Sequence, residues 1–576
     1  MKQLLRYLGH YKIESILGPL FKLLEASFEL LVPLVMAQII DVGIKNRDLS
    51  YILGRGGILV GLGVVGMVCA ITAQYFAAKA SVGCGASLRR DLFAHLQGLS
   101  YAELDALGTS TMLTRMTSDI NQVQNGVNMA LRLFLRSPFI VFGSMVMAFT
   151  VNLPAAMVFA VAIPLLYLVV FGVMFVTLPL YRRVQERLDR VLLLTRENLT
   201  GVRVIRAFGR EKEERAEFDE ASGLLVRAQF TVGKISAVMN PATCVIINCA
   251  ILVILWIGGR QVDIGVLTQG QVIALVSYMS QMLVELVKLA NLIVLVTKSV
   301  ACANRVQSVM EIQSTILPGS VIPRELPREA VTFRDLSFTY RGAKAEAISR
   351  LDFSVLRGQT IGIIGGTGSG KSTLINLIPR FYDATEGAVL VDGVDVREWD
   401  TGALRSRIGV VPQRAALFQG TVRENLLWGR EDATDSDLWN ALETACAADF
   451  ISADPAGLDR EIMQGGKNLS GGQRQRLTIA RALVRKPEIL ILDDSASALD
   501  HATDAKLRQN IAALDPGLTV FIVSQRAASV WNADQIIVLE EGRAVGLGTH
   551  QQLLESCPVY QEIYYSQYPK EETAHG

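Results

Sequence analysis

The sequence lacks three features that mark common classes of soluble protein. Its seven cysteines include no CxxC pair, which argues against a zinc site or a disulfide framework and favours buried thiols. Lysine and arginine (56) nearly balance aspartate and glutamate (55), so nothing indicates nucleic acid as a partner. Long apolar runs are absent after about residue 300, but they are frequent before it. Since half of all residues are hydrophobic, membrane spans are expected in that first part.

Six apolar segments are long enough to cross a bilayer, which requires roughly 20 residues. We predict spans at about 15–40, 52–78, 129–151, 155–178, 236–259 and 270–298. Between them, the stretches 79–128 and 179–234 are long and polar, and the second is rich in arginine. Positive charge marks the cytoplasmic side, so both stretches, the N-terminus and everything after the last span are expected in the cytoplasm. Their helical periodicity predicts helices that continue beyond the membrane.

The character of the chain changes after the last span. Residues 311–330 contain Pro318, Pro323 and Pro327, which break helices and favour an extended linker. From 331 to 570, short apolar runs alternate with helical patterns, which predicts an α/β domain. We therefore expect an all-α transmembrane domain of six helices over 1–310, a linker, and a cytoplasmic α/β domain.

The most specific motif lies near the start of the α/β domain. A β-branched run leads into the G-x4-G-K-[ST] pattern of a phosphate-binding loop. Its glycines let backbone N–H groups point at phosphate oxygens, and the next helix offers its positive end. Lys371 is expected to neutralise the β- and γ-phosphates of ATP, and Ser372 to supply a hydroxyl to Mg²⁺. The residues predicted to bind ATP here are Gly365, Gly366, Thr367, Gly368, Ser369, Gly370, Lys371, Ser372 and Thr373.

Two further motifs follow the phosphate loop. The run Ile489–Leu492 predicts a buried parallel strand, which ends in Asp493, a carboxylate placed to hold Mg²⁺ through water. Asp494 comes next, where a water-activating group would lie. Before this strand, LSGGQRQR (469–476) opens a predicted helix, and a helix N-terminus receives anions.

With these three motifs in this order, the chain resembles the ABC transporter family, whose signature is LSGGQ. Its whole layout resembles a bacterial half-transporter with the type I ABC exporter fold, and ENLTGVRVIRAFGREKEE (197–214) is typical of such exporters. The overall sequence pattern most resembles that of one subunit of heterodimeric multidrug-type exporters. The resemblance implies ATP-driven export of a small amphipathic molecule across the inner (plasma) membrane by alternating access, with a second half-transporter as partner.

The resemblance also implies roles for residues outside the phosphate loop. Tyr340 matches the aromatic residue that stacks on adenine, although an ordinary strand tyrosine is the alternative. Gln413 matches the glutamine that contacts Mg²⁺ and links the site to the membrane domain, so the implied metal ligands are Ser372, Gln413 and Asp493. In this family two ATPase domains meet head to tail. The residues implied to act on the partner's ATP are Ser470, Gly471, Gly472, Gln473 and Asp500.

Two positions depart from the family's pattern. The general base after the Mg²⁺ aspartate is normally glutamate, but here it is Asp494, one methylene shorter, and a misplacement of about 1 Å can cost about 100-fold in rate. The switch position after the next strand is normally a histidine that contacts the γ-phosphate, but here it is Gln525. Together they predict that this chain binds ATP but hydrolyses it slowly, while its intact LSGGQ completes the partner's site. The alternative is that Asp494 and Gln525 still support hydrolysis.

Other functions remain compatible with these motifs, namely an ATP-gated channel, a regulatory subunit, an importer or a lipid flippase. For coupling, the resemblance implies that the turn around Tyr101–Gly108 and the segment Thr200–Arg210 dock on the ATPase domains.

Charges within the spans leave two interpretations open. Lys22, Glu25 and Glu29 share one helical face, where they line a path for cationic substrates or, in a Lys22–Glu25 pair, stabilise the helix. Glu285 and Lys288 pose the same question in the last span.

Overall fold

The computed structural model describes residues 6–323, 327–495 and 497–568, and it divides into two compact units. The first comprises Met1–Gln97 and Thr109–Ile312, and the second comprises Gly98–Gly108 and Gln313–Gly576. The short segment Gly98–Gly108, which lies within the predicted transmembrane domain 1–310, belongs to the unit that contains the α/β domain. Parts of the predicted regions lie outside the described residues, namely 1–5 of the transmembrane domain, 324–326 of the linker, and 496 and 569–570 of the α/β domain.

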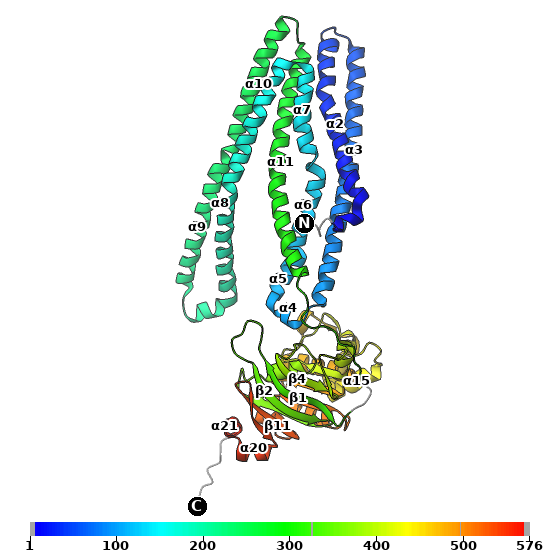
Figure 1. The fold of residues 1–576 in the computed structure, drawn as a ribbon, viewed down its shortest axis with the longest axis vertical. Helices are drawn as coiled ribbons and strands as arrows, with labels where there is room; N and C mark the ends of the chain where they lie inside the picture. The colour runs from blue at the N-terminus through cyan, green and yellow to red at the C-terminus, as the bar shows by residue number, and fades with distance from the viewer. Residues whose placement is uncertain (1–5, 324–326, 496, 569–576) are drawn as a thin grey trace, which may run out of the picture. The chain divides into compact units, whose positions relative to one another are not determined.

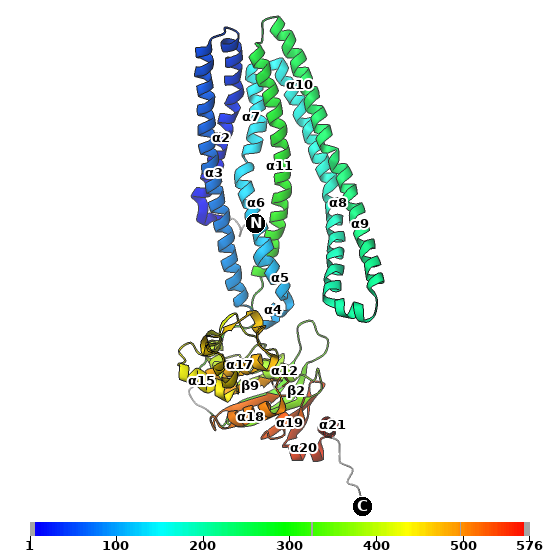
Figure 2. The ribbon, with the colours of Figure 1, turned by 180° about the vertical axis from the view of Figure 1, so that it is seen from behind.

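The first unit is helical, and the described residues include six helices long and apolar enough to cross a membrane, as predicted. Its elements are α2 (Lys12–Gln38), η2 (Ile39–Ile44), α3 (Leu49–Gln97), α5 (Thr109–Thr114), η3 (Arg115–Asp119), α6 (Ile120–Leu133), α7 (Arg136–Val151), α8 (Leu153–Ala207), α9 (Glu211–Ala237), α10 (Met239–Asp263) and α11 (Gln269–Met310). Figures 1 and 2 show α8 and α9 side by side up to the turn that joins them.

The helices of this unit extend well beyond what a bilayer requires. α8 has 55 residues, a length of about 80 Å at the usual rise, whereas the hydrocarbon core is about 30 Å thick. Its start is fixed by Asn152, whose side chain accepts a hydrogen bond from the Ala155 N–H at 3.0 Å. The predicted continuation of the spans as helices is therefore confirmed for this element.

The second unit is an α/β structure. Its elements are α4 (Tyr101–Leu107), β1 (Glu329–Phe338), β2 (Ile348–Leu356), β3 (Thr360–Gly365), α12 (Lys371–Leu377), β4 (Glu386–Val391), β5 (Val394–Asp395), α13 (Thr401–Arg407), β6 (Ile408–Val411), β7 (Gly420–Thr421), α14 (Val422–Leu427), α15 (Asp435–Thr444), α16 (Ala448–Ser452), β8 (Glu461–Ile462), α17 (Gly471–Val484), β9 (Ile489–Asp493), α18 (His501–Ala512), β10 (Thr519–Val523), α19 (Ala527–Val530), β11 (Gln535–Glu540), β12 (Arg543–Gly548), α20 (His550–Ser556) and α21 (Pro558–Gln567).

Two larger sheets form this unit. One has the order β2-β1-β4-β5 and is antiparallel. The other has the order β12-β11-β3-β10-β9-β6, and its strands from β11 to β6 run parallel. Its central strands β9 and β10 are buried along their whole length, which explains why they read as continuous apolar runs. Parallel strands end at the same edge, so loops distant in sequence meet there.

Candidate nucleotide-binding site

Four neighbouring parallel strands bring the predicted site residues to one edge of the sheet. β3 leads into the phosphate loop, β10 into Gln525, β9 into Asp493 and Asp494, and β6 into Gln413. Ligands in open α/β sheets bind outside the carboxyl ends of the strands. The topology therefore places these predicted residues at the edge where a ligand is expected.

The phosphate loop needs its glycines for steric reasons. Gly368 and Gly370 have φ of 81° and 95°, a region that side chains rarely adopt. A Cβ on Gly370 would also lie 2.5 Å from the Ala347 carbonyl oxygen. Lys371 closes the loop, because its ammonium donates to the carbonyl oxygens of Gly365 at 2.9 Å and Gly366 at 2.6 Å. Burial lowers the pKa of Lys371, and the carboxylates of Asp494 and Asp493 oppose that shift.

Oxygen ligands suited to Mg²⁺ meet beside this loop. The Ser372 hydroxyl donates to the Asp493 carboxylate at 3.0 Å. Burial raises the pKa of Asp493, and the nearby Asp494 adds to this effect, while the Ser372 hydrogen bond opposes it. Hydroxyl and carboxylate oxygens are what Mg²⁺ prefers, and it usually takes them together with substrate phosphates. The side chains present therefore fit the metal.

Gln413 and Asp494 contact one another directly. The Gln413 amide donates to the Asp494 carboxylate at 3.2 Å. The Asp494 backbone has φ of 45°, and its N–H donates to the Val523 carbonyl oxygen at 3.0 Å. This bond joins Asp494 to the last residue of β10, two residues before Gln525. The two positions that depart from the family's pattern therefore lie close together.

Tyr340 lies two residues beyond the end of β1, so it is not a strand residue. Its hydroxyl is 3.0 Å from the Thr373 hydroxyl on α12, and 37% of the residue is exposed. The ring lies edge-on to Tyr382, with centroids 5.5 Å apart. A partly exposed aromatic ring fixed to the phosphate-loop helix can serve as a platform for a flat base.

The LSGGQ residues form the start of α17. The Ser470 N–H donates to the Gln473 side chain at 2.9 Å, and the Gln473 N–H donates to the Ser470 hydroxyl at 3.2 Å, which is a capping box. Asp500 likewise caps α18, accepting from the Thr503 N–H at 2.9 Å, and this bond keeps the pKa of Asp500 low. Ser470 and Asp500 are both exposed.

Comparison with known proteins agrees with this geometry. Residues 15–286 match the family described as ABC transporter transmembrane region, and residues 348–497 match ABC transporter. An uncharacterized ABC transporter ATP-binding protein of Mycobacterium tuberculosis is 37% identical over 555 residues, which is 95% of each chain. The chain belongs to the ABC transporter family. It therefore carries an ABC ATPase domain together with membrane-spanning helices.

Two further similarities bear on fold and function. An ATP-dependent lipid A-core flippase of Chromohalobacter salexigens is 30% identical to this ABC transporter over 93% of both chains. The structure of a bacterial Atm1-family ABC exporter with ATP bound superposes with a TM-score of 0.79 at 23% identity, covering 98% of this chain and 99% of that one. This likeness shows that the fold is that of a type I ABC exporter.

The resemblance implies that the segment around α4 of this ABC transporter docks on an ATPase domain, but it names no residues that α4 would contact. The Tyr101 ring lies 4.7 Å from the Phe381 ring, and the Tyr382 hydroxyl donates to Asp105 at 2.6 Å. Burial raises the pKa of Tyr382, and the bond to Asp105 adds to it. Phe381 and Tyr382 were not singled out from the sequence, although two adjacent aromatic residues shortly after the phosphate-loop motif were a visible signal.

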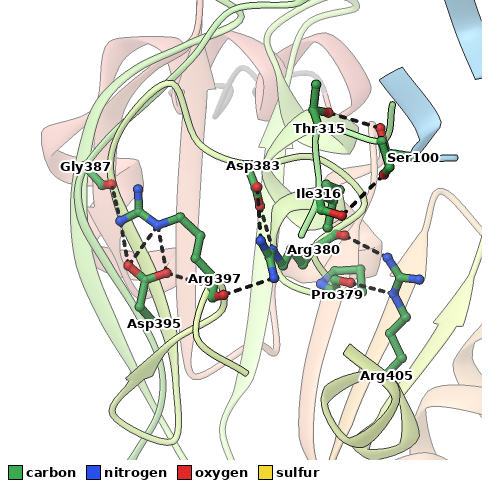
Figure 3. A network of polar contacts seen from close by, with 11 residues as sticks. Ser100, Thr315, Ile316, Pro379, Arg380, Asp383, Gly387, Asp395, Arg397 and Arg405 are labelled. Atoms are coloured by element: carbon green, nitrogen blue, oxygen red, sulfur yellow. Dashed lines mark hydrogen bonds and ion pairs between the residues drawn. The ribbon is translucent and has the colours of Figure 1, made fainter. Parts of the chain in front are cut away.

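Polar contacts support this surface (Figure 3). Ser100 caps α4, and its hydroxyl lies 3.3 Å from that of Thr315. Arg405 donates to the carbonyl oxygens of Pro379 at 3.1 Å and Arg380 at 2.8 Å, and its guanidinium lies 5.3 Å from the centre of the Phe381 ring. The loop after α12 is thus held in place on the side that receives α4.

The membrane-spanning unit contains a network of charges across three helices. Within α2, the Lys22 ammonium contacts Glu25 at 2.5 Å, which is the predicted helix-stabilising pair. Glu29 pairs instead with Arg136 of α7 at 2.6 Å. Arg136 also donates to Glu285 of α11 at 2.7 Å. The sequence reasoning missed Arg136, although an arginine inside a predicted span was its signal.

The centre of this charge network is buried. Arg136 is 7% exposed and Glu285 is 2% exposed, and Glu285 also accepts from Lys288 at 2.8 Å and from Ser137 at 2.9 Å. Arg136 begins α7, directly after the interruption between α6 and α7. Arg136 lies about 22 Å along α7 from the end of that helix at Val151, and Glu285 lies about 24 Å along α11 from the start of that helix at Gln269. These charges therefore lie at one depth, and each is paired, as buried charges require.

Proposed function

We propose that this chain is one subunit of a heterodimeric ABC exporter, whose own ATP site hydrolyses slowly and whose LSGGQ completes its partner's hydrolytic site. One observation carries the proposal: Asp494 and Gln525 replace the family's two catalytic residues, while Ser470–Gln473 are intact. Residues 1–310 would form the transmembrane domain, 311–330 the linker, and 331–570 the ATPase domain. The N-terminus and the ATPase domain would lie in the cytoplasm, with the spans in the inner membrane.

The phosphate-loop residues have the parts needed to bind ATP. The loop N–H groups and Lys371 would hold the phosphates, and Tyr340 would support the adenine. Ser372 and Asp493, joined by Gln413, would hold Mg²⁺, which supplies charge neutralisation at the β- and γ-phosphates. ATP and Mg²⁺ are therefore the cofactors that this site would take.

Slow hydrolysis follows from the side chains at the two unusual positions. Asp494 is shorter than glutamate and is engaged by Gln413, so its carboxylate reaches less far toward an attacking water. Gln525 has a neutral amide, which can donate a hydrogen bond but cannot exchange a proton as a histidine does. Bound ATP would then act here mainly to hold two ATPase domains together.

Coupling to the membrane domain would use two cytoplasmic segments, namely α4 and the turn between α8 and α9. In this chain, Tyr382 connects the ring of Tyr340 to Asp105 on α4, so a change at the adenine side can reach α4. The other end, between α8 and α9, exposes Leu199 (74%), Val204 (60%) and Phe208 (76%). We assign this apolar tip to the partner's ATPase domain, where it would be covered.

The proposed substrate follows from the fold and from one relative. Export of a small amphipathic molecule by alternating access fits the type I exporter fold. The similarity to a lipid A-core flippase favours lipid transport as a second candidate. An ATP-gated channel or regulatory subunit would instead show passive flux. ATP-dependent uptake of a tracer into inside-out vesicles would support export, and uptake without hydrolysis would support a channel.

The asymmetric ATP site can be tested with the full chain purified alone in lipid nanodiscs. The wild type should bind ATP and hydrolyse little. Two copies of the chain would supply LSGGQ to each other, so Asp494→Glu combined with Gln525→His should raise hydrolysis at least tenfold by restoring both missing groups, whereas each single change should raise it less. Rapid turnover by the wild-type chain without a partner would contradict the proposal.

A further inference from the structure

The switch loop that contains Gln525 is held by α21, the last helix among the described residues. The Gln567 side chain, at the end of α21, makes two hydrogen bonds to this loop. Its amide oxygen accepts from the Ala527 N–H at 2.9 Å, and its amide nitrogen donates to the Gln525 carbonyl oxygen at 2.8 Å. One side chain thus fixes the backbone on both sides of Arg526, the residue that follows the switch position.

The loop depends on Gln567 because local capping is missing. α19 begins at Ala527, and its N-cap residue, Arg526, provides no side-chain cap. The first N–H groups of a helix have no partner within the helix and need an acceptor from elsewhere. Gln567 supplies that acceptor to Ala527. A helix from the end of the chain therefore replaces the local cap.

The orientation of Gln525 itself rests on this backbone. Among the residues that the structure describes, its side-chain amide makes no hydrogen bond, and the residue is exposed. On its other side, Ser524 is fixed to β3, because its N–H donates to the Ile363 carbonyl oxygen at 3.1 Å. The direction in which Gln525 projects is then set by β3 on one side and by Gln567 on the other.

α21 is anchored firmly enough to act as a support. Tyr560 is fully buried, and its hydroxyl lies 2.7 Å from Nδ1 of His550. Just after the end of α21, the Tyr568 ring lies 5.9 Å from the ring of Trp531, the residue that follows α19. Gln567 therefore contacts the first residue of α19, and Tyr568 contacts the residue that follows its last turn.

We infer that Gln567 is a positioning residue for the switch loop, which sets how Gln525 meets the γ-phosphate of ATP. The inference rests on the proposed role of Gln525 at the γ-phosphate. It makes the final helix part of the machinery that distinguishes ATP from ADP, since only ATP carries that phosphate.

The test measures MgATP and MgADP affinities of the full chain in lipid nanodiscs. Gln567→Met keeps the size of the side chain but removes both hydrogen bonds, and we expect the preference for ATP over ADP to fall about 3- to 10-fold with ADP affinity unchanged. Gln561→Met is the matched control, because Gln561 lies on the same helix and donates to the Leu554 carbonyl oxygen at 2.6 Å, away from the switch loop. This control should leave the preference unchanged.

A third variant tests the role of Gln525 separately from the role of Gln567. Gln525→Ala should lower the ATP preference if Gln525 meets the γ-phosphate. If it does not, the role of the switch position fails and the inference falls with it. If Gln525→Ala lowers the preference but Gln567→Met does not, only the inference is overturned. Equal losses of ATP and ADP affinity in Gln567→Met would indicate a merely structural role and would also overturn it.

Discussion

Two groups of site residues in this ATPase domain differ in what they contact. We call them the phosphate-loop half, which consists of Lys371, Ser372 and Gln413, and the LSGGQ half, which consists of Ser470–Gln473. In the first half, Lys371, Ser372 and Gln413 each bind another part of the same site. In the second half, the side chains of Ser470 and Gln473 each bind the backbone N–H of the other residue at an exposed helix start. The first half is therefore assembled within one chain, whereas within the described residues these two side chains make no hydrogen bond to the first half.

The largest expected effect tests the LSGGQ half. Ser470→Arg places a bulky cation at the start of α17, so hydrolysis by the assembled pair should fall about 100-fold or more, while ATP binding to this chain alone stays unchanged. Thr549→Arg is the matched control, because Thr549 caps α20 through the same type of capping box. Steady-state ATPase activity of the pair is the measurement. A normal rate in Ser470→Arg would remove the difference between the two halves.

The phosphate-loop half is tested by Lys371→Ala. Loss of the ammonium removes charge-assisted bonds to the phosphates, so ATP affinity of the chain alone should fall about 10- to 100-fold. MgATP is expected to raise the Tm of the wild type, and in Lys371→Ala this shift should disappear at the same nucleotide concentration. Retention of that shift would mean that ATP binds this chain elsewhere.

A smaller effect is expected where the phosphate-loop half connects to α4. Tyr382→Phe keeps the ring but removes the hydrogen bond to Asp105, so transport by the pair should fall about fivefold, with hydrolysis changed by less than about twofold. Tyr340→Phe is the control, since it removes a hydroxyl from the same aromatic cluster without touching α4. Parallel losses of transport and hydrolysis would indicate damage to the site rather than to coupling.

The smallest effect is expected at Asp494. In the assembled pair, Asp494→Asn should reduce hydrolysis by less than about threefold, because the proposal assigns most turnover to the partner's site. Replacing the partner's catalytic glutamate by glutamine should abolish most activity. If Asp494→Asn proves as damaging as the partner's substitution, the two sites are equivalent and the asymmetric proposal is wrong.

Sequence reasoning was most successful where local pattern decides structure. The phosphate loop, the buried strand before Asp493 and the six spans each follow from a short run of residues with its own physical signature. The roles of Tyr340, Gln413 and Asp500 came from the resemblance, and the structure adds the contacts of each. It places Asp500 in a helix cap, which is a local structural use of that carboxylate.

The remaining contacts join residues far apart in the chain, and no local pattern encodes them. Tyr382 and Asp105 are separated by 277 positions, and Gln567 meets the switch loop only because α21 folds back onto α19. The same holds for Arg136 and Glu285, which are 149 positions apart. In each case the residue types were visible, but their partners depended on the tertiary fold.

The charge network of the membrane helices also has a consequence for how the protein is made. Translation proceeds from the N-terminus, so α2 with Glu29 already exists when Arg136 emerges, whereas Glu285 on α11 is synthesised much later. The third span therefore enters the bilayer with two carboxylates of α2 available, those of Glu29 and Glu25, which lie 2.6 Å and 3.9 Å from the Arg136 guanidinium. With Lys22, these four charges already sum to zero, and α11 then adds Glu285 together with Lys288, which is again a neutral pair. The last membrane helix thus adds hydrogen bonds to Arg136 without changing the net charge of the network, which is neutral at each stage.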